Sequence, residues 1–360
     1  MSNTFTERLY WLAWAWHPKI GPITIAKLRA AFGSLAQAWS AKPTALSQAG
    51  LDQSLVSQLN DWRDHTNPTQ LADQLERQHI SFVTWLEPDY PLLLKEIFDP
   101  PPVLFYRGDL TVANRRCLSI VGSRHPSSYG QKVTTDLTQV AVQSGLVIVS
   151  GLAYGVDALA HLTCLKQNGL TIAVLAAGLD TIYPAANRQL AERILKQGGL
   201  ILSEYPPGTP ALKQHFPHRN RLIAGLSQGL LITEATTQSG SLITATQALD
   251  FNRQVCAVPG DIYSPLSAGC HQLIKQGAEP ITQTQDLCRL FNLTPAPTIP
   301  LPNLTTAEQT LLQQLPLKAL TLNEIINLTS DSADNLLALL TMLELKGYVK
   351  SDTGDRFARL

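Results

Sequence analysis

Residues 204 to 244 read EYPPGTPALKQHFPHRNRLIAGLSQGLLITEATTQSGSLIT. A helical pattern rich in cations leads to an apolar run over 229–233, which ends in Glu234, and then to a small-residue loop at 239–241 and a second helical pattern. This order is typical of a βα unit. Backbone N–H groups of the loop, with cations and one aromatic ring nearby, suit a polyanion that carries flat bases. A solvated basic segment beside an ordinary βα unit is the alternative.

The same alternation continues on both sides of this stretch. Apolar runs of strand length recur and are separated by amphipathic helical patterns. Strands are expected at Cys117–Val121, Leu146–Ser150, Thr171–Ala176, Leu200–Ser203, Gly229–Thr233 and Gln254–Val258. Helices are expected near Gln131–Gln143, Val156–Gln167, Asn187–Lys196, Arg219–Leu226 and Leu242–Phe251. Continuous apolar strands that alternate with helices predict an α/β fold with a doubly wound parallel sheet.

Small or polar residues follow each of these strands. Ligands of doubly wound sheets bind outside the carboxyl ends of the strands, so six loops are expected to converge on one cleft. After the first strand, Arg124 takes the place of the second glycine in the GxGxxG dinucleotide motif, and no acid ends the second strand, which disfavours NAD. The Arg124 guanidinium either pairs with an external phosphate or satisfies carbonyl groups at the strand end.

One pair of residues and two single residues leave two interpretations each. Asp157 and His161 stand one helical turn apart, and we expect a hydrogen-bonded pair that supports the preceding glycine loop, with catalysis as the alternative. Glu234 either aids N-glycosidic cleavage of a nucleotide or caps neighbouring backbone N–H groups. Phe216 either stacks on a base or packs under a helix that starts at Pro217.

The chain divides into four segments by composition and pattern. Residues 1–66 are expected to form short helices, with a turn at His17–Pro22 that resembles a helix-hairpin-helix unit or is a purely structural hairpin. Residues 67–292 carry the main sheet, and their first part adds edge strands to it. A proline-rich linker is expected over 293–304. Three helices and a hairpin over 305–360 predict a winged-helix-like module, which we expect to contact proteins or to be vestigial rather than to bind DNA.

Composition bounds the class of protein. Of 360 residues, 44% are hydrophobic and 16% are charged, so the chain can bury a large core. Lys+Arg and Asp+Glu both number 28, so a polyanion site has to be a local concentration of cations. Five cysteines without a CxxC pair favour a reducing compartment over disulfides or zinc. With no secretory signal and no apolar run of membrane length, we expect a cytoplasmic protein without membrane contact.

Several segments occur in the order found in one known family. The chain resembles the DprA/Smf family of DNA-processing proteins in GSR at 122–124, SGLAYGVDALAH at 150–161, GLDTIYPAANRQL at 178–190, HFPHRNRLIAGLS at 215–227 and TEATTQSGSLITA at 233–245. This resemblance covers the region from 89 to 280 densely. It implies an extended Rossmann-type domain between a SAM-like or helix-hairpin-helix-like N-terminal domain and a winged-helix-like C-terminal domain.

The resemblance also implies a function. It implies sequence-independent binding of single-stranded DNA and loading of the RecA recombinase onto it during natural transformation of competent cells, by a homodimer formed through the Rossmann domain. We expect no catalytic residue, no metal and no cofactor. Arg124 and Lys213 correspond to the pocket cations of the family and Phe216 to its stacking ring. The complete set of implied DNA-binding residues is Gly122, Ser123, Arg124, Gly151, Lys213, Phe216, Arg219, Asn220, Arg221, Ser239, Gly240 and Ser241.

Two other classes of protein are alternatives. A nucleotide-processing enzyme of the phosphoribohydrolase type would use the same Rossmann cleft. Such enzymes have sequences that resemble PGGxGTxxE, in which the glutamate follows a glycine loop. Here Glu234 precedes Ser239 and Gly240, and the loop contains no PGG. A winged-helix transcription factor would need a basic recognition helix, which the segment from 332 to 346 lacks.

Overall fold

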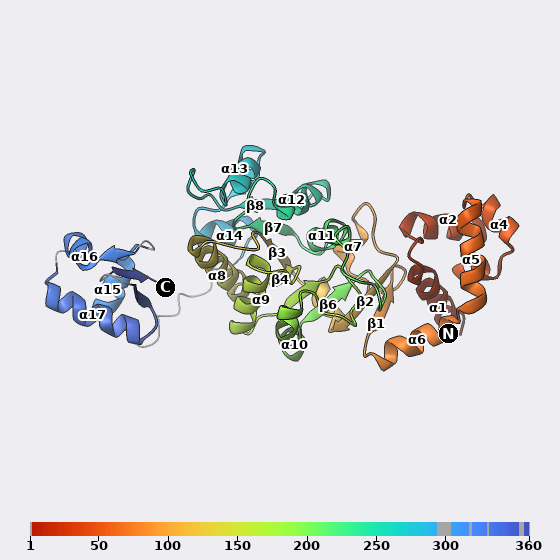
Figure 1. Ribbon diagram of the computed structural model, residues 1–360, viewed down its shortest axis with the longest axis horizontal. Helices are drawn as coiled ribbons and strands as arrows, with labels where there is room; N and C mark the ends of the chain where they lie inside the picture. Colours follow the sequence, from red (N-terminus) through yellow and green to blue (C-terminus); the bar gives the residue numbers. More distant parts are fainter. Residues whose placement is uncertain (1, 294–303, 317–318, 330, 353–355, 360) are drawn as a thin grey trace. The chain divides into compact units, whose positions relative to one another are not determined.

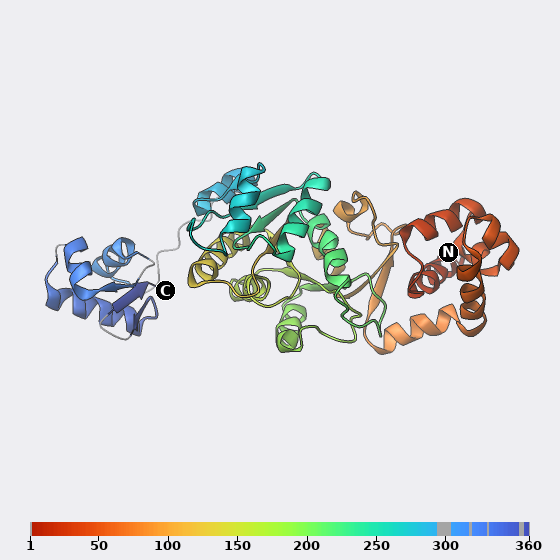
Figure 2. The ribbon, with the colours of Figure 1, turned by 45° about the horizontal axis from the view of Figure 1, so that its top comes forward.

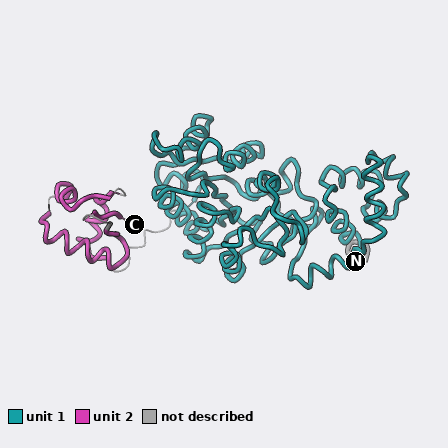
Figure 3. The backbone as a smooth tube through the Cα atoms, viewed as in Figure 1, with its two compact units in different colours: residues 1–295 teal, residues 296–360 magenta. Residues whose placement is uncertain are grey.

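The computed structural model describes residues 2–293, 304–316, 319–329, 331–352 and 356–359. The chain forms two compact units, Met1–Pro295 and Ala296–Leu360, which Figure 3 shows in different colours. Apart from its two end residues, the linker predicted at 293–304 lies outside the described residues. Among the described helices, none is both long enough and apolar enough to cross a bilayer.

The N-terminal part of the first unit is helical, as its sequence predicts. Its helices are α1 (Ser2–Trp16), α2 (Pro22–Phe32), α3 (Leu35–Ser40), α4 (Pro43–Gln48), α5 (Gln53–His65) and α6 (Pro68–Arg77). One hydrophobic cluster joins Leu12 and Leu28 of these helices to strand residues such as Phe105 and Ile201. Trp16 packs edge-on against Phe105, with ring centroids 5.9 Å apart. The helices and the sheet therefore share a core.

Within the described residues, nine strands form the main sheet in the order β1-β2-β6-β5-β4-β3-β7-β8-β9. Strands β3 to β9 pair in parallel, and β1 and β2 add an antiparallel edge. Their bounds are β1 (Ser81–Thr84), β2 (Val103–Gly108), β3 (Cys117–Val121), β4 (Val147–Ser150), β5 (Thr171–Val174), β6 (Leu200–Ser203), β7 (Gly229–Ile232), β8 (Gln254–Ala257) and β9 (Glu279–Pro280). The six parallel strands expected from the apolar runs are confirmed, and the strand order reverses between β3 and β7.

Helices cover both faces of this sheet, which confirms the doubly wound fold. Figure 1 and Figure 2 show α9 and α10 on one side of the strands and α12 and α13 on the other. The bounds are α7 (Leu92–Lys95), α8 (Ser128–Gln143), α9 (Val156–Lys166), α10 (Arg188–Lys196), α11 (His215–Gly225), α12 (Gly240–Asp250), α13 (Ala268–Lys275) and α14 (Thr284–Leu290), with single 3₁₀ turns at Leu110–Asn114 and Ala185–Asn187. Helix α11 begins four residues before the predicted Arg219, because Pro217 is tolerated in a first turn, where no N–H partner is lost.

The second unit has three helices and a small antiparallel sheet. Its elements are α15 (Thr306–Gln314), β10 (Leu320–Thr321), α16 (Leu322–Thr329), α17 (Ala333–Leu345), β11 (Val349–Asp352) and β12 (Arg356–Arg359), with strand order β10-β12-β11. Leu311, Ile325, Leu336, Leu340 and Leu343 form a core of its own. The predicted winged-helix arrangement of three helices and a hairpin is confirmed.

Candidate nucleic-acid interface

A cleft opens where the sheet changes direction, at the carboxyl ends of β3 and β7. The two strand ends are tied together, since the Ser123 N–H donates to the Glu234 carbonyl at 2.8 Å. The cleft has a volume of about 760 Å³ and is lined by the loops after β3 and β7, by α11 and by the start of α12. Of the twelve predicted binding residues, all but Gly151 and Arg221 line it. The expected convergence of strand-end loops is therefore present.

Glu234 is a structural cap and does not line this cleft. It is 2% exposed, and its carboxylate accepts hydrogen bonds from the N–H of Ser127 at 2.8 Å and from the Ser127 hydroxyl at 2.5 Å. Ser127 is itself the N-cap of α8. A Cβ atom at Gly130 would stand 2.2 Å from the Glu234 Oε2, which explains the glycine there. The capping interpretation of Glu234 is thus confirmed.

Arg219 lines the floor of the cleft, but its side chain is almost fully buried. Only 4% of its surface is exposed, and its guanidinium donates to the carbonyl groups of Gly151, at 2.7 Å, and Val174. Burial lowers its pKa to about 10, and the nearby Asp157 carboxylate opposes this fall. A Cβ at Gly151 would lie 2.2 Å from the Arg219 Nη1. Gly151 is therefore small because a buried guanidinium occupies the space beside it.

Asp157 supports the glycine loop, as predicted, but not as a pair with His161. Its carboxylate accepts from the N–H groups of Gly151 at 3.0 Å and Ala153 at 3.4 Å. Burial raises the pKa of Asp157, and the Arg219 charge counteracts part of the rise. The His161 ring instead bonds the Thr171 hydroxyl at 2.7 Å, and burial lowers its pKa to about 3. The predicted Asp157–His161 bond is wrong, because Thr171 on the adjacent strand takes the imidazole.

Arg221 is also buried, outside the cleft, and it is held by two acids. Its Nε donates to Asp99 at 2.9 Å and its Nη2 to Glu204 at 2.6 Å, and 3% of its surface is exposed. His218 approaches the same Glu204 at 3.0 Å. These contacts fasten α11 to the segment before β2 and to the end of β6. A salt-bridged guanidinium in this position holds the helix in place.

Two cations and one ring face the cleft itself. Arg124 and Lys213 are exposed, and neither forms an ion pair with any residue that the structure describes. Phe216 is half-buried, and the Cζ atoms of Arg124 and Arg219 lie 6.0 and 5.9 Å from its ring centroid. Asn220 donates to the Gly240 carbonyl at 3.4 Å. Of the predicted cations, Arg124 and Lys213 are the ones placed to meet an external anion.

The start of α12 forms another wall of the cleft. Ser239 is its N-cap, and the Ser239 hydroxyl accepts from the Ser241 N–H at 3.3 Å. Gly240 leaves open space, since a Cβ there would meet no atom within 4 Å. Helix N-termini present unpaired N–H groups and a positive dipole end to an anion. This wall and the two cations give the cleft a local positive character in a chain of zero net charge.

Tyr183 was missed from the sequence. Its ring lies 5.6 Å from that of Phe216, centroid to centroid, and it lines the same cleft. The loop that carries it follows β5, at the same edge of the sheet. An aromatic residue in a strand-end loop was the available signal. His125, Thr236 and Gln238 line the cleft as well and were also missed.

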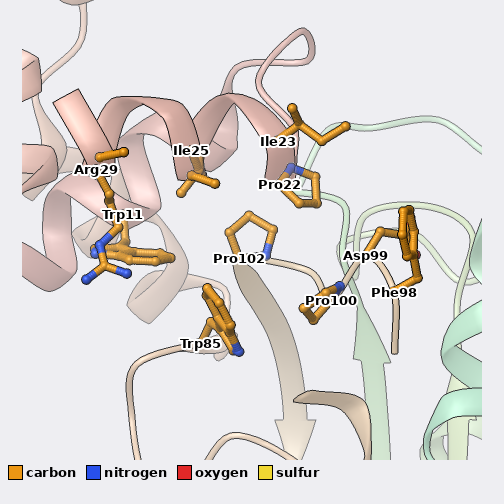
Figure 4. A pocket seen from close by; sticks show the side chains of 12 residues that line it. Trp11, Pro22, Ile23, Ile25, Arg29, Trp85, Phe98, Asp99, Pro100 and Pro102 are labelled. Carbon is orange, nitrogen blue, oxygen red and sulfur yellow. The ribbon is translucent and has the colours of Figure 1, made fainter. Parts of the chain in front are cut away.

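A second groove on the first unit is mostly apolar, unlike the cleft. A groove of about 550 Å³ lies between α2 and the segment before β2, and Figure 4 shows Trp11, Ile23, Trp85 and Phe98 around it. The Arg29 guanidinium there stands 5.3 Å from the Trp11 ring centroid. Its lining is mostly apolar, and no described group of three His, Cys, Asp or Glu side chains is placed to hold a metal in this groove or elsewhere. The cationic cleft is the better anion site.

Comparison with known proteins decides the family. Residues 81–292 match the family model described as DNA recombination-mediator protein A, and residues 295–355 match the DprA winged helix domain. The chain belongs to the DprA/Smf family. Among family members, Protein Smf of Synechocystis is 44% identical over 292 residues, which cover 80% of this chain and 73% of that protein. The DNA processing protein DprA of Bacillus subtilis is 46% identical over 211 residues, or 58% of this chain and 71% of that one.

Two solved DprA structures resemble this fold. The X-ray structure of DprA from Streptococcus pneumoniae has a TM-score of 0.68 and 36% identity, and the match covers 80% of this chain and 98% of that chain. The Helicobacter pylori protein, whose structure was described for its single-stranded DNA binding mode, has a TM-score of 0.54 and 31% identity over 59% of this chain and 97% of that one. The predicted family and fold are confirmed.

Proposed function

We propose that the chain binds single-stranded DNA without sequence preference in the cleft between β3 and β7. The proposal is carried by the conjunction of two exposed cations, Arg124 and Lys213, which form no ion pair within the described part of the chain, with the half-exposed ring of Phe216 and the start of α12. Cations track a phosphate backbone, and a ring accepts any base by stacking, because every base has a π face. In a duplex the bases are already stacked on one another, so Phe216 favours the single strand. The Helicobacter relative that binds such DNA supports this choice of ligand.

The binding residues divide by their surroundings. Arg124 and Lys213 pair with phosphates, Phe216 stacks, and Asn220 orients the α12 wall. Gly122, Ser123, Ser239, Gly240 and Ser241 let the backbone approach from both sides of the cleft. Gly151, Arg219 and Arg221, which the resemblance assigns to DNA contact, act through the scaffold instead. Burial and existing hydrogen bonds leave their guanidinium and backbone groups little capacity for a phosphate.

We propose a non-catalytic role for this cleft. The enzyme alternative needs a carboxylate beside a bound nucleotide, and Glu234 is the acid that the sequence offers. Its two oxygens hold the Ser127 N–H and hydroxyl, at a site outside the cleft lining. A carboxylate engaged in capping α8 is poorly placed to assist departure of a base.

The wider role follows from the family. We propose that the protein loads the RecA recombinase onto the bound strand during natural transformation and acts as a homodimer through the Rossmann domain, which agrees with the family description of a recombination mediator. A cytoplasmic location is supported by the five cysteines, all of which are free and buried. We also propose the division into a helical segment over 1–66, a DNA-binding domain over 67–292 and a winged-helix domain over 305–360.

Fluorescence anisotropy with labelled oligo-dT and a matched duplex, at two salt concentrations, tests the binding proposal. We expect tight binding of the single strand, weaker binding of the duplex, and a marked loss of affinity at the higher salt concentration, because phosphate contacts release counterions. If neither DNA binds, the proposal is wrong. Hydrolysis of nucleoside monophosphates by the wild-type protein and a Glu234→Gln variant would then examine the enzyme alternative.

A further inference from the structure

A smaller cavity adjoins the cleft on the side of β5 and β6. It has a volume of about 350 Å³ and lies between the loops that follow these two strands. The loops are fastened to each other, since the Gly178 N–H donates to the Thr209 carbonyl and the Gly208 N–H to the Asp180 carboxylate, both at 2.9 Å. Its lining residues are Ala177, Asp180, Thr181, Tyr183, Gly208, Thr209, Pro210 and Ala211. The cavity is thus formed by two loops that hydrogen bonds join to each other.

Tyr183 forms the wall between this cavity and the cleft, and it is the residue that lines both. Half of its surface, 50%, is exposed. Its ring plane is tilted by 61° from that of Phe216, at a centroid distance of 5.6 Å. Because two planes so tilted cannot both lie parallel to one base, each ring offers its face to a different base. A strand that stacks on Phe216 therefore has a second aromatic face within one nucleotide of reach.

The chemistry of the smaller cavity favours a base over a phosphate. Most of its lining is small and uncharged, and its one formal charge is the Asp180 carboxylate, which repels a phosphate. No Lys or Arg is among its lining residues. The cations that suit the backbone, Arg124 and Lys213, lie on the cleft side of Tyr183. A nucleobase is the part of the strand that such a cavity accommodates.

We propose that Tyr183 and the cavity behind it form a second base-binding subsite, in which a nucleobase next to the one on Phe216 stacks on the tyrosine ring. This inference rests on the proposed function of the cleft. It makes the single-strand site a pair of aromatic platforms that hold two neighbouring bases, with the phosphates held by the cations on one side.

The test compares oligo-dT with an abasic oligomer of equal length, for wild type and for Tyr183→Ala, Phe216→Ala and the double variant. We expect Tyr183→Ala to weaken oligo-dT binding by about 5- to 150-fold, the range for loss of one stacked base. Affinity for the abasic strand and the salt dependence should not change, since no cation is removed. Tyr183→Phe should bind like wild type. The matched control is Tyr154→Ala, because Tyr154 is similarly exposed, at 47%, and lines neither cavity.

The double variant separates two subsites from one. If each ring holds its own base, the double variant binds oligo-dT more weakly than either single variant. If it binds no more weakly than Phe216→Ala, Tyr183 acts only through its neighbour and the second subsite is wrong, while the proposed function stands. An equal loss for oligo-dT and the abasic strand would overturn the subsite as well. Failure of wild type to bind oligo-dT at all would instead contradict the proposed function, and the subsite with it. Unchanged thermal unfolding of each variant confirms that the fold is intact.

Discussion

The position of a guanidinium in this protein decides what the residue does. Arg124, Arg219 and Arg221 all belong to the motifs that mark the family, but of the three only Arg124 is exposed to solvent. Their local sequences do not distinguish them. The partners of the buried pair, such as the Gly151 carbonyl and Asp99, are 68 and 122 residues away in the chain. The sequence therefore allowed us to predict that these arginines belong to the region of the site. Which of them are buried depends on contacts between residues far apart in the chain, which only the fold creates.

The exposed arginine gives the prediction at this scale. We expect Arg124→Ala to weaken binding of all single-stranded sequences alike, because a phosphate contact carries no base information. Loss of one such contact should also reduce the slope of log affinity against log salt by about 0.7. Anisotropy titrations of oligo-dT over a series of salt concentrations measure both. Arg289→Ala is the control, since Arg289 is exposed on α14 and does not line the cleft. Unchanged affinity in Arg124→Ala would remove this residue from the site.

At the level of elements, the positions of the strands could be predicted from the sequence. The packing of the Arg219 side chain beside Gly151 could not. Continuous apolar runs placed β3 to β8 within a residue or two, because a strand buried on both faces requires them. Helix α11 begins at His215, four residues before the predicted pattern near Arg219–Leu226 and two before the start at Pro217 that one interpretation of Phe216 assumed. Nothing in the run around Gly151 indicates that a side chain from α11 fills the space beside it. Close packing between elements that are distant in the chain produces no periodic pattern in the local sequence from which it could be predicted.

That packing can be tested at Gly151. A methyl group there would stand 2.2 Å from the Arg219 Nη1 and 2.6 Å from its Cζ. The guanidinium cannot move aside without breaking its bonds to the carbonyl groups of Gly151 and Val174. We expect Gly151→Ala to destabilise the protein by about 1–3 kcal/mol, as measured by the urea midpoint. Gly240→Ala is the control, because its added methyl group meets no atom within 4 Å. Equal stability of the two variants would show that Arg219 is not tightly held.

For the whole molecule, the two units carry separate cores. The clusters that surround the main sheet draw on residues up to Leu293, and the cluster of the second unit begins at Leu304. From the sequence, a boundary is predicted within the proline-rich stretch at 293–304, because this stretch interrupts both periodic patterns. The role of the winged-helix module was harder to predict from the sequence. Its third helix, α17, contains no Lys or Arg.

A truncated chain tests whether the second unit takes part in binding. We expect a chain that ends at residue 293 to fold and to bind oligo-dT with the affinity and salt dependence of the full chain, since the proposed binding residues all lie in the first unit. Circular dichroism and the same anisotropy titration are the measurements. A truncated chain that folds but binds more weakly would show that the winged-helix unit contributes contacts of its own.

The buried guanidinium of Arg219 has a consequence for selectivity. It already satisfies the carbonyl groups at the ends of β4 and β5 from below, so the cleft floor is in place before any strand arrives. The loss of freedom on binding then falls on the DNA rather than on the protein. DNA strands differ in this respect. Stacking between neighbouring bases stiffens a purine-rich strand, whereas a pyrimidine-rich strand is more flexible. A protein without base-specific contacts reads no sequence, and any modest difference in its affinity among strands would then come from the flexibility of the DNA.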